Sequence, residues 1–180
     1  MKIASFDLEI AKELPQDPGD WRQYAPLGIT CAAAALSNNG QGISWAKQMN
    51  HWNDRHRISV AGCRQIVYDL TELHNAGFRI VTWNGTGFDF AVLAQESGMV
   101  EECAHLALNH TDMMLQVTFR KGWYLGLEAA LKGARLPGKL KAVQLNSGQY
   151  IDEMNGALAP RLWADGEYQA VLAYLEDDVN

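Results

Sequence analysis

The first ten residues constrain the fold of this chain more than any other segment. Successive side chains of a β-strand point to opposite faces of the sheet. In an extended strand one face would therefore be purely apolar, with Ala4, Phe6, Leu8 and Ile10. The other face would carry Asp7 and Glu9. We predict a strand over residues 1–10 that is central in its sheet, beside a second strand at residues 28–36.

The remaining patterns predict the other elements of an α/β domain. A small, apolar run over 28–36 indicates a buried strand, and a turn at 38–40 indicates a hairpin return at 43–46. Ser59 is the expected N-cap of a helix to about residue 75, with Gly77 at its C-terminal end. The other expected elements are a strand over 78–83, helices over 88–98, 125–132 and 163–179, and an irregular segment over 138–158. Strands followed by helix, strand and helix favour a mixed sheet.

Composition excludes several classes of protein. The 180 residues show no repeat or linker, so we expect one domain over 1–180. No apolar run approaches the roughly 20 residues that span a bilayer, and Asp7 interrupts any signal peptide, which indicates a soluble, cytoplasmic protein without membrane contact. Three widely spaced cysteines fit neither a disulfide framework nor a zinc site. The net charge of −6 argues against extended contacts with duplex DNA.

Asp7 and Glu9 form the first candidate site. Two carboxylates on one face of an otherwise apolar strand repel each other and lose hydration. A bound Mg²⁺ or Mn²⁺ removes both costs, because hard cations prefer carboxylate oxygens. A solvated sheet edge with two surface acids explains the same pattern without a metal. The pair alone leaves both interpretations open.

Two further motifs place acids at the ends of predicted elements. In residues 83–90 a strand ends, two glycines form a sharp turn, and Asp89 falls in the first turn of a helix, where the helix dipole favours a carboxylate. On the last helix Tyr174 and Asp178 lie four residues apart at one border of the apolar stripe. Asp177 turns further outward, so we choose Asp178 as the site residue. Taken singly, these motifs also fit an ordinary helix start and the solvated side of a terminal helix.

The ordered set of three motifs resembles a known family. Asp-x-Glu on a first strand, Asn-x-x-x-Phe-Asp at a strand-to-helix turn and Tyr-x-x-x-Asp on a late helix are similar to the motifs of DEDD 3′→5′ exonucleases of the tyrosine-containing branch. Relatives include RNase D-like enzymes and the proofreading domains of DNA polymerases. The resemblance spans nearly the whole chain and implies a ribonuclease H-like fold, with a central mixed sheet flanked by helices. The chain departs from the family at Ile10, where many relatives have Thr or Ser.

This resemblance implies a metal-dependent exonuclease that hydrolyses the 3′-terminal phosphodiester of DNA or RNA. Two divalent cations, Mg²⁺ or Mn²⁺, would be held by four carboxylates: Asp7, Glu9, Asp89 and Asp178. One ion would activate the attacking water and the other would stabilise the leaving 3′ oxygen. Tyr174 would orient the water, because an unperturbed tyrosine pKa of about 10 makes it a poor base at neutral pH.

The substrate would be single-stranded or 3′-ended nucleic acid. Leu8, Ile10 and Phe88 would pack on the terminal base or sugar, because stacking on apolar and aromatic groups tolerates any base. Asn84 would form a hydrogen bond with the terminal nucleotide. Further stacking candidates lie in less regular stretches of the chain, at Trp21, Trp52 and Trp123.

Several nearby polar residues have simpler interpretations. Lys139 and Lys141 lie in the expected irregular segment, where a solvated loop is favoured over phosphate contacts. Asp112 resembles an extra acid found near the site in relatives, but helix capping or strand entry is the favoured role.

Three other functions remain open. The first is a catalytically degenerate ribonuclease H-like module that only binds nucleic acid; the presence of all four acids and the tyrosine disfavours it. The second is an internal-cutting ribonuclease H-like nuclease, such as a Holliday-junction resolvase, which the Tyr-x-x-x-Asp pair and the Asn-x-x-x-Phe-Asp turn disfavour. The third is a non-enzymatic domain with incidental acids, which would require three coincidences in the right order.

Overall fold

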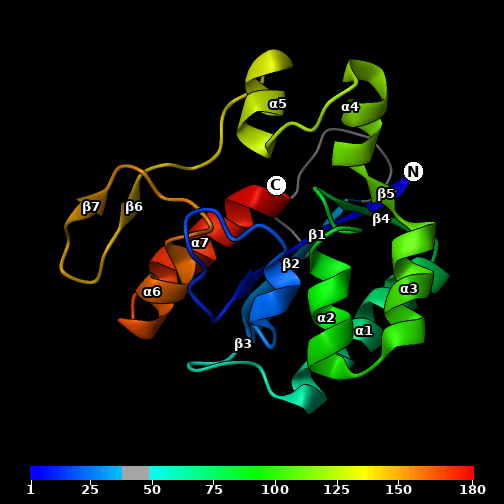
Figure 1. The fold of residues 1–180 in the computed structure, drawn as a ribbon, viewed down its shortest axis with the longest axis horizontal. Coiled ribbons are helices and arrows are strands. Elements are labelled where there is room, and N and C mark those ends of the chain that lie inside the picture. The colour runs from blue at the N-terminus through cyan, green and yellow to red at the C-terminus, as the bar shows by residue number, and fades with distance from the viewer. Residues whose placement is uncertain (38–48) are drawn as a thin grey trace.

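A five-stranded mixed sheet forms the centre of the computed structural model, which describes residues 1–37 and 49–180 (Figure 1). The strand order is β3-β2-β1-β4-β5. The strands are β1 (Lys2–Ile10), β2 (Ile29–Ser37), β3 (Met49–Asn53), β4 (Phe78–Thr82) and β5 (Thr111–Asp112). β1 pairs antiparallel with β2 and parallel with β4. The predicted central position of the first strand, beside the strand at 28–36, is therefore confirmed.

Both faces of the sheet are covered by helices. On one face lie α1 (Val60–Asn75), α2 (Asp89–Ser97) and α3 (Val100–Asn109), which pack on Phe6, Leu8 and their apolar neighbours. On the other face α6 (Ala159–Ala164) and α7 (Tyr168–Val179) pack on Cys31, Ala33 and Ala35 of β2. Small side chains on β2 allow α7 to lie close to the sheet, against β2 and β1 (Figure 1). The expected α/β class with a ribonuclease H-like arrangement is confirmed.

Local signals in the sequence set several of these elements. The Ser59 hydroxyl caps α1 by accepting a hydrogen bond from the Gly62 amide at 3.2 Å, and Gly77 follows the end of this helix, as predicted. The three cysteines are buried and free. None of the helices within the described residues is both long and apolar enough to cross a membrane.

Other boundaries differ from the predictions. The expected helix over 163–179 is two helices, because the chain reverses at Gly166, whose φ of +85° ends α6 after Ala164. The expected irregular segment 138–158 contains a short hairpin of β6 (Val143–Gln144) and β7 (Tyr150–Ile151). The expected strand at 43–46 lies outside the described residues, and β3 is the strand that pairs with the far side of β2.

Three helical segments were not predicted: α3, α4 (Met113–Lys121) and a short 3₁₀ turn at Trp21–Tyr24. α4 has no fully buried residue: Met113, Leu115 and Phe119 are exposed, and Met114 and Val117 are half-buried. Helix α5 (Leu127–Gly133) matches the expectation over 125–132 within two residues, and it likewise buries no side chain.

Candidate metal centre

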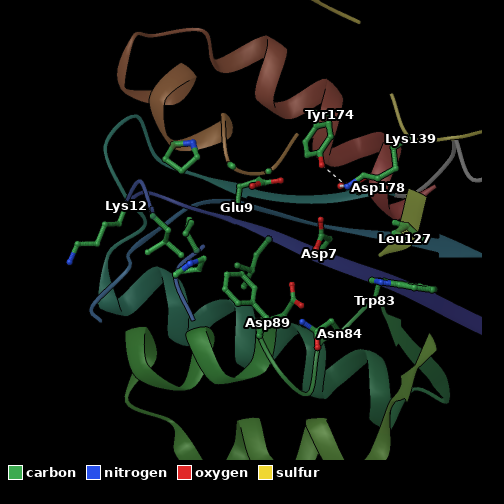
Figure 2. A pocket seen from close by; sticks show the side chains of 18 of the residues that line it. Asp7, Glu9, Lys12, Trp83, Asn84, Asp89, Leu127, Lys139, Tyr174 and Asp178 are labelled. Atoms are coloured by element: carbon green, nitrogen blue, oxygen red, sulfur yellow. Dashed lines mark hydrogen bonds and ion pairs between the residues drawn. The ribbon is translucent and has the colours of Figure 1, made fainter. Parts of the chain in front are cut away.

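The three acid motifs meet in one pocket of about 420 Å³ (Figure 2). Carboxylate oxygens of Asp7, Glu9 and Asp178 lie within 4.8 Å of one another. Asp89 faces Asp7 from the opposite wall, and Tyr174 lies beside Asp178 (Figure 2). The structure thus brings together all five residues that the sequence analysis expected to form the catalytic site.

Secondary structure places each acid. Asp7 and Glu9 project from the face of β1 opposite the Phe6 side chain, as the alternation requires. α7 crosses the small side chains of β2, and Asp178 reaches Asp7 from there. Asp89 begins α2, directly after the turn that ends β4.

Glycines shape that turn. A Cβ atom at Gly85 would lie 2.3 Å from the Thr82 hydroxyl, and one at Gly87 would lie 2.5 Å from the side-chain oxygen of Asn84. Both distances are shorter than real atoms allow, so a side chain at Gly87 would displace the Asn84 side chain. At Gly85 the Thr82 Cβ also lies within 2.7 Å, so this position fits glycine best.

Burial and mutual repulsion perturb these carboxylates. Burial is the largest cause in each case, and it raises the pKa of Glu9 from 4.5 to about 8 and that of Asp89 from 3.8 to about 7. The pKa of Asp7 is raised well above its ordinary value by burial and then by the charge of Asp89. Burial also raises the pKa of Asp178, against the opposing effect of Lys139.

This donor set fits hard divalent cations. One oxygen of Asp89 and one of Asp178 are buried without a hydrogen-bond partner. Such oxygens lose their hydration without replacement, which a directly bound metal ion would correct. Oxygen ligands alone, all from carboxylates, are the preference of Mg²⁺ and Mn²⁺ rather than of zinc or copper.

Lys139 is a site residue that the sequence analysis missed. Its ammonium group lies 2.6 Å from Asp178 Oδ2 and 2.5 Å from the Tyr174 hydroxyl, and its side chain is only 22% exposed. The favoured interpretation as a solvated loop residue was therefore wrong, because the loop folds back against α7. For Lys141 it was right, since this exposed side chain pairs with Glu128 on the surface.

The structure separates the two adjacent acids of α7. Asp178 lies in the carboxylate cluster, whereas Asp177 is exposed and accepts a hydrogen bond from the Leu140 amide at 2.6 Å. Asp177 thus holds the loop that carries Lys139. The Tyr174 hydroxyl is buried, and burial followed by the charge of Asp178 raises its pKa, so it stays protonated at neutral pH.

The four expected substrate contacts belong to the wall of the pocket. Leu8, Ile10, Asn84 and Phe88 all line it. Leu8 and Ile10 are mostly buried in the core, at 4% and 8% exposure, so only part of each side chain faces the cavity. Phe88 and Asn84 are half-buried at the wall. Trp83, which the sequence analysis did not select, also lines the pocket, and its indole N–H is buried without a partner.

The three tryptophan candidates have different environments. Trp52 packs edge-on against Phe6 and donates a hydrogen bond to Asp69, so it is a structural residue and the stacking interpretation was wrong. Trp21 packs against Phe88, with 5.3 Å between the ring centroids. Trp123 is 60% exposed.

Asp112 has the favoured structural role. One of its carboxylate oxygens accepts from the amides of Met114 and Leu115, which caps α4. The carboxylate also accepts from the amides of Asn84 and Thr86 at 3.0 and 3.1 Å. This single side chain therefore fixes the turn that precedes Asp89.

Comparisons with known proteins establish the fold alone. The structure is similar to that of the family B DNA polymerase from the hyperthermophilic archaeon Pyrobaculum calidifontis, with a TM-score of 0.63 and 15% sequence identity. The similarity covers 99% of this chain and 23% of the polymerase. No protein-family model and no curated protein sequence matches the chain.

Proposed function

We propose that this protein is a metal-dependent 3′→5′ exonuclease that hydrolyses the 3′-terminal phosphodiester of DNA or RNA. The observation that carries the proposal is the convergence of Asp7, Glu9 and Asp178 within 4.8 Å, with Asp89 facing them across the pocket. A buried cluster of four acids is costly without cations, so a structural role alone does not account for it.

The four acids and Tyr174 would have different roles in this reaction. Asp7 is central and would contact both ions; Glu9 and Asp178 would complete the ligands of one, and Asp89 those of the other. Bound Mg²⁺ or Mn²⁺ would supply an activated water and stabilise the leaving oxygen. Tyr174 keeps its proton and would therefore donate a hydrogen bond that orients the attacking water rather than act as a base.

Two independent arguments support this function over the alternatives. The ordered motifs resemble exonucleases that include polymerase proofreading domains, and a DNA polymerase is among the proteins of similar fold. All four acids and the tyrosine are present in one pocket, which disfavours a degenerate binding module.

A time course with 5′-labelled single-stranded and blunt substrates of DNA and RNA tests the proposal. With Mg²⁺ or Mn²⁺ we expect a ladder that shortens from the 3′ end, and EDTA should abolish it. Internal products without a ladder would instead indicate an internal-cutting nuclease. Binding without any cleavage by the metal-loaded protein would indicate a degenerate module, and either result refutes the proposal.

A further inference from the structure

Residues 113–141, here called the basic aromatic segment, differ in charge from the rest of the chain. They hold six of the 15 Lys and Arg residues but one of the 21 Asp and Glu residues. The whole chain nevertheless carries a net charge of −6. Positive charge is therefore concentrated in one segment of an otherwise acidic protein.

The same segment exposes large aromatic side chains. Phe119, Trp123 and Tyr124 are 90%, 60% and 70% exposed. Phe119 lies on α4, and Trp123 and Tyr124 lie between α4 and α5; because all three are exposed, core packing does not explain these apolar groups. Exposed apolar groups that cluster in one segment typically mark a binding surface.

The cations of this segment are available to a ligand. Its one acid, Glu128, pairs with Lys141 at 3.0 Å and accepts from the Lys139 amide. Four basic residues of the segment form no ion pair within the part of the chain that the structure describes: Arg120, Lys121, Lys132 and Arg135.

The basic aromatic segment is continuous with the pocket. Leu127 of α5 and Lys139 both line the cavity (Figure 2). The contacts of Glu128 tie α5 to the stretch that carries Lys139, and Lys139 contacts Asp178 directly. A strand whose 3′ end occupies the pocket would therefore meet this segment as it leaves, at the edge of the molecule where α4 and α5 lie (Figure 1).

We infer that the basic aromatic segment binds the single-stranded nucleic acid upstream of the 3′ end, an inference that rests on the proposed function. Aromatic faces stack on bases of any sequence, and Lys and Arg neutralise the phosphates between them. The stretch Phe119-Arg120-Lys121-Gly122-Trp123-Tyr124 supplies both kinds of group within six residues. A second copy that met the same segment across a two-fold axis would bring the cations of both copies together, whereas a single strand offers bases to the aromatic groups and phosphates to the cations.

Equilibrium binding in EDTA tests the inference without any hydrolysis. The probes are fluorescein-labelled oligothymidylates of about three and about twelve nucleotides, because single-strand sites cover on the order of 4–16 nucleotides. The wild type should bind the longer probe at least tenfold more tightly than the shorter one. The double variant Phe119→Ala/Trp123→Ala should lose that advantage, since each lost stacking contact weakens binding by about tenfold. Tyr68→Ala, which removes an aromatic side chain that is 53% exposed on α1, is the matched control and should bind as the wild type does.

The outcomes separate this inference from the proposed function. Equal affinity of the double variant and the wild type for the longer probe overturns the inference, whatever the activity. A second outcome also overturns it: the wild type forms dimers, the double variant is monomeric, and both bind the probe equally. That result would identify a second copy of the chain as the occupant. Loss of length-dependent binding in the double variant, together with no cleavage by the metal-loaded wild type, supports the inference and refutes the exonuclease. Melting curves of the folded variants exclude unfolding as the cause.

Discussion

Replacing Glu9 by Gln should stabilise the metal-free protein and weaken its response to metal. Glu9 is 6% exposed, and burial, followed by the charge of Asp178, raises its pKa from 4.5 to about 8. A carboxylate with a raised folded-state pKa costs nothing below its unfolded value of 4.5. Its cost grows as the pH rises from 4.5 to about 8, where the folded state also ionises.

The size of the free-energy cost of the Glu9 carboxylate follows from the difference between the pH and the unfolded pKa. At pH 7 the protein is about 2.5 pH units above the unfolded pKa of 4.5. At about 1.4 kcal/mol per unit, the Glu9 carboxylate lowers the free energy of unfolding by on the order of 3 kcal/mol. Gln keeps the shape and removes the charge, so this cost disappears at pH 7, whereas at pH 4.5 the two proteins should be similar.

Thermal unfolding in EDTA and in millimolar Mg²⁺ or Mn²⁺ measures both effects. For a chain of this size roughly 1 kcal/mol shifts the melting temperature by about 2–4 °C, so Glu9→Gln should melt about 6–12 °C above the wild type at pH 7 in EDTA. Metal should raise the melting temperature of the wild type far more than that of the variant, because a ligand of the folded state stabilises it. Glu13→Gln, on an exposed residue, is the matched control and should change neither value.

Two results would refute this reasoning. A Glu9→Gln protein that is less stable than the wild type in EDTA at pH 7 would show that Glu9 is satisfied without metal. A variant that gains as much stability from Mg²⁺ as the wild type would show that Glu9 is not a ligand.

Three further predictions concern residues in the pocket and residues that support it. Asp178→Asn should reduce nucleotide release by orders of magnitude, because it removes a carboxylate of the cluster. Asp177→Asn should leave the activity nearly normal, because the Asn side chain still accepts from the Leu140 amide, and Tyr174→Phe should have an intermediate activity. An inactive Asp177→Asn protein would contradict the choice of Asp178 as the site residue. Lys139→Met should lower the free energy of unfolding in EDTA by about 2 kcal/mol, measured by urea denaturation, because the variant loses the ion pair with Asp178. Saturating Mg²⁺ should recover part of this loss. Unchanged stability in EDTA would show that Lys139 does not compensate the charge of the acids. Asp112→Ala should cost roughly 2–4 kcal/mol, because four backbone amides lose their acceptor; a melting temperature equal to that of the wild type would exclude this role.

The sequence by itself determined the central strand and the identity of the acids that converge. Alternation in residues 1–10 separates an apolar face from an acidic face, and this period-two pattern is local information. The Ser59 cap is likewise a short-range signal, and so are the glycines of the turn before Asp89, although the Asp112 carboxylate, 28 residues from Asn84 in the chain, also holds that turn. Such features need no knowledge of distant contacts, which is why the predicted elements appear in the structure.

Only the tertiary structure decided the environment of those acids. Lys139 enters the cluster because Asp177 and Glu128 hold its loop by contacts 37 and 11 residues apart in the chain. No sequence period encodes such a contact, so a lysine in a Gly-rich stretch resembled a solvated one. Helix α4 was not predicted either; it has no fully buried side chain, and Met113, Leu115 and Phe119 are exposed. Periodicity in a sequence indicates which side chains are buried, whereas Lys139 is placed by a hydrogen bond and an ion pair to residues more than 30 positions away, which no periodic pattern encodes.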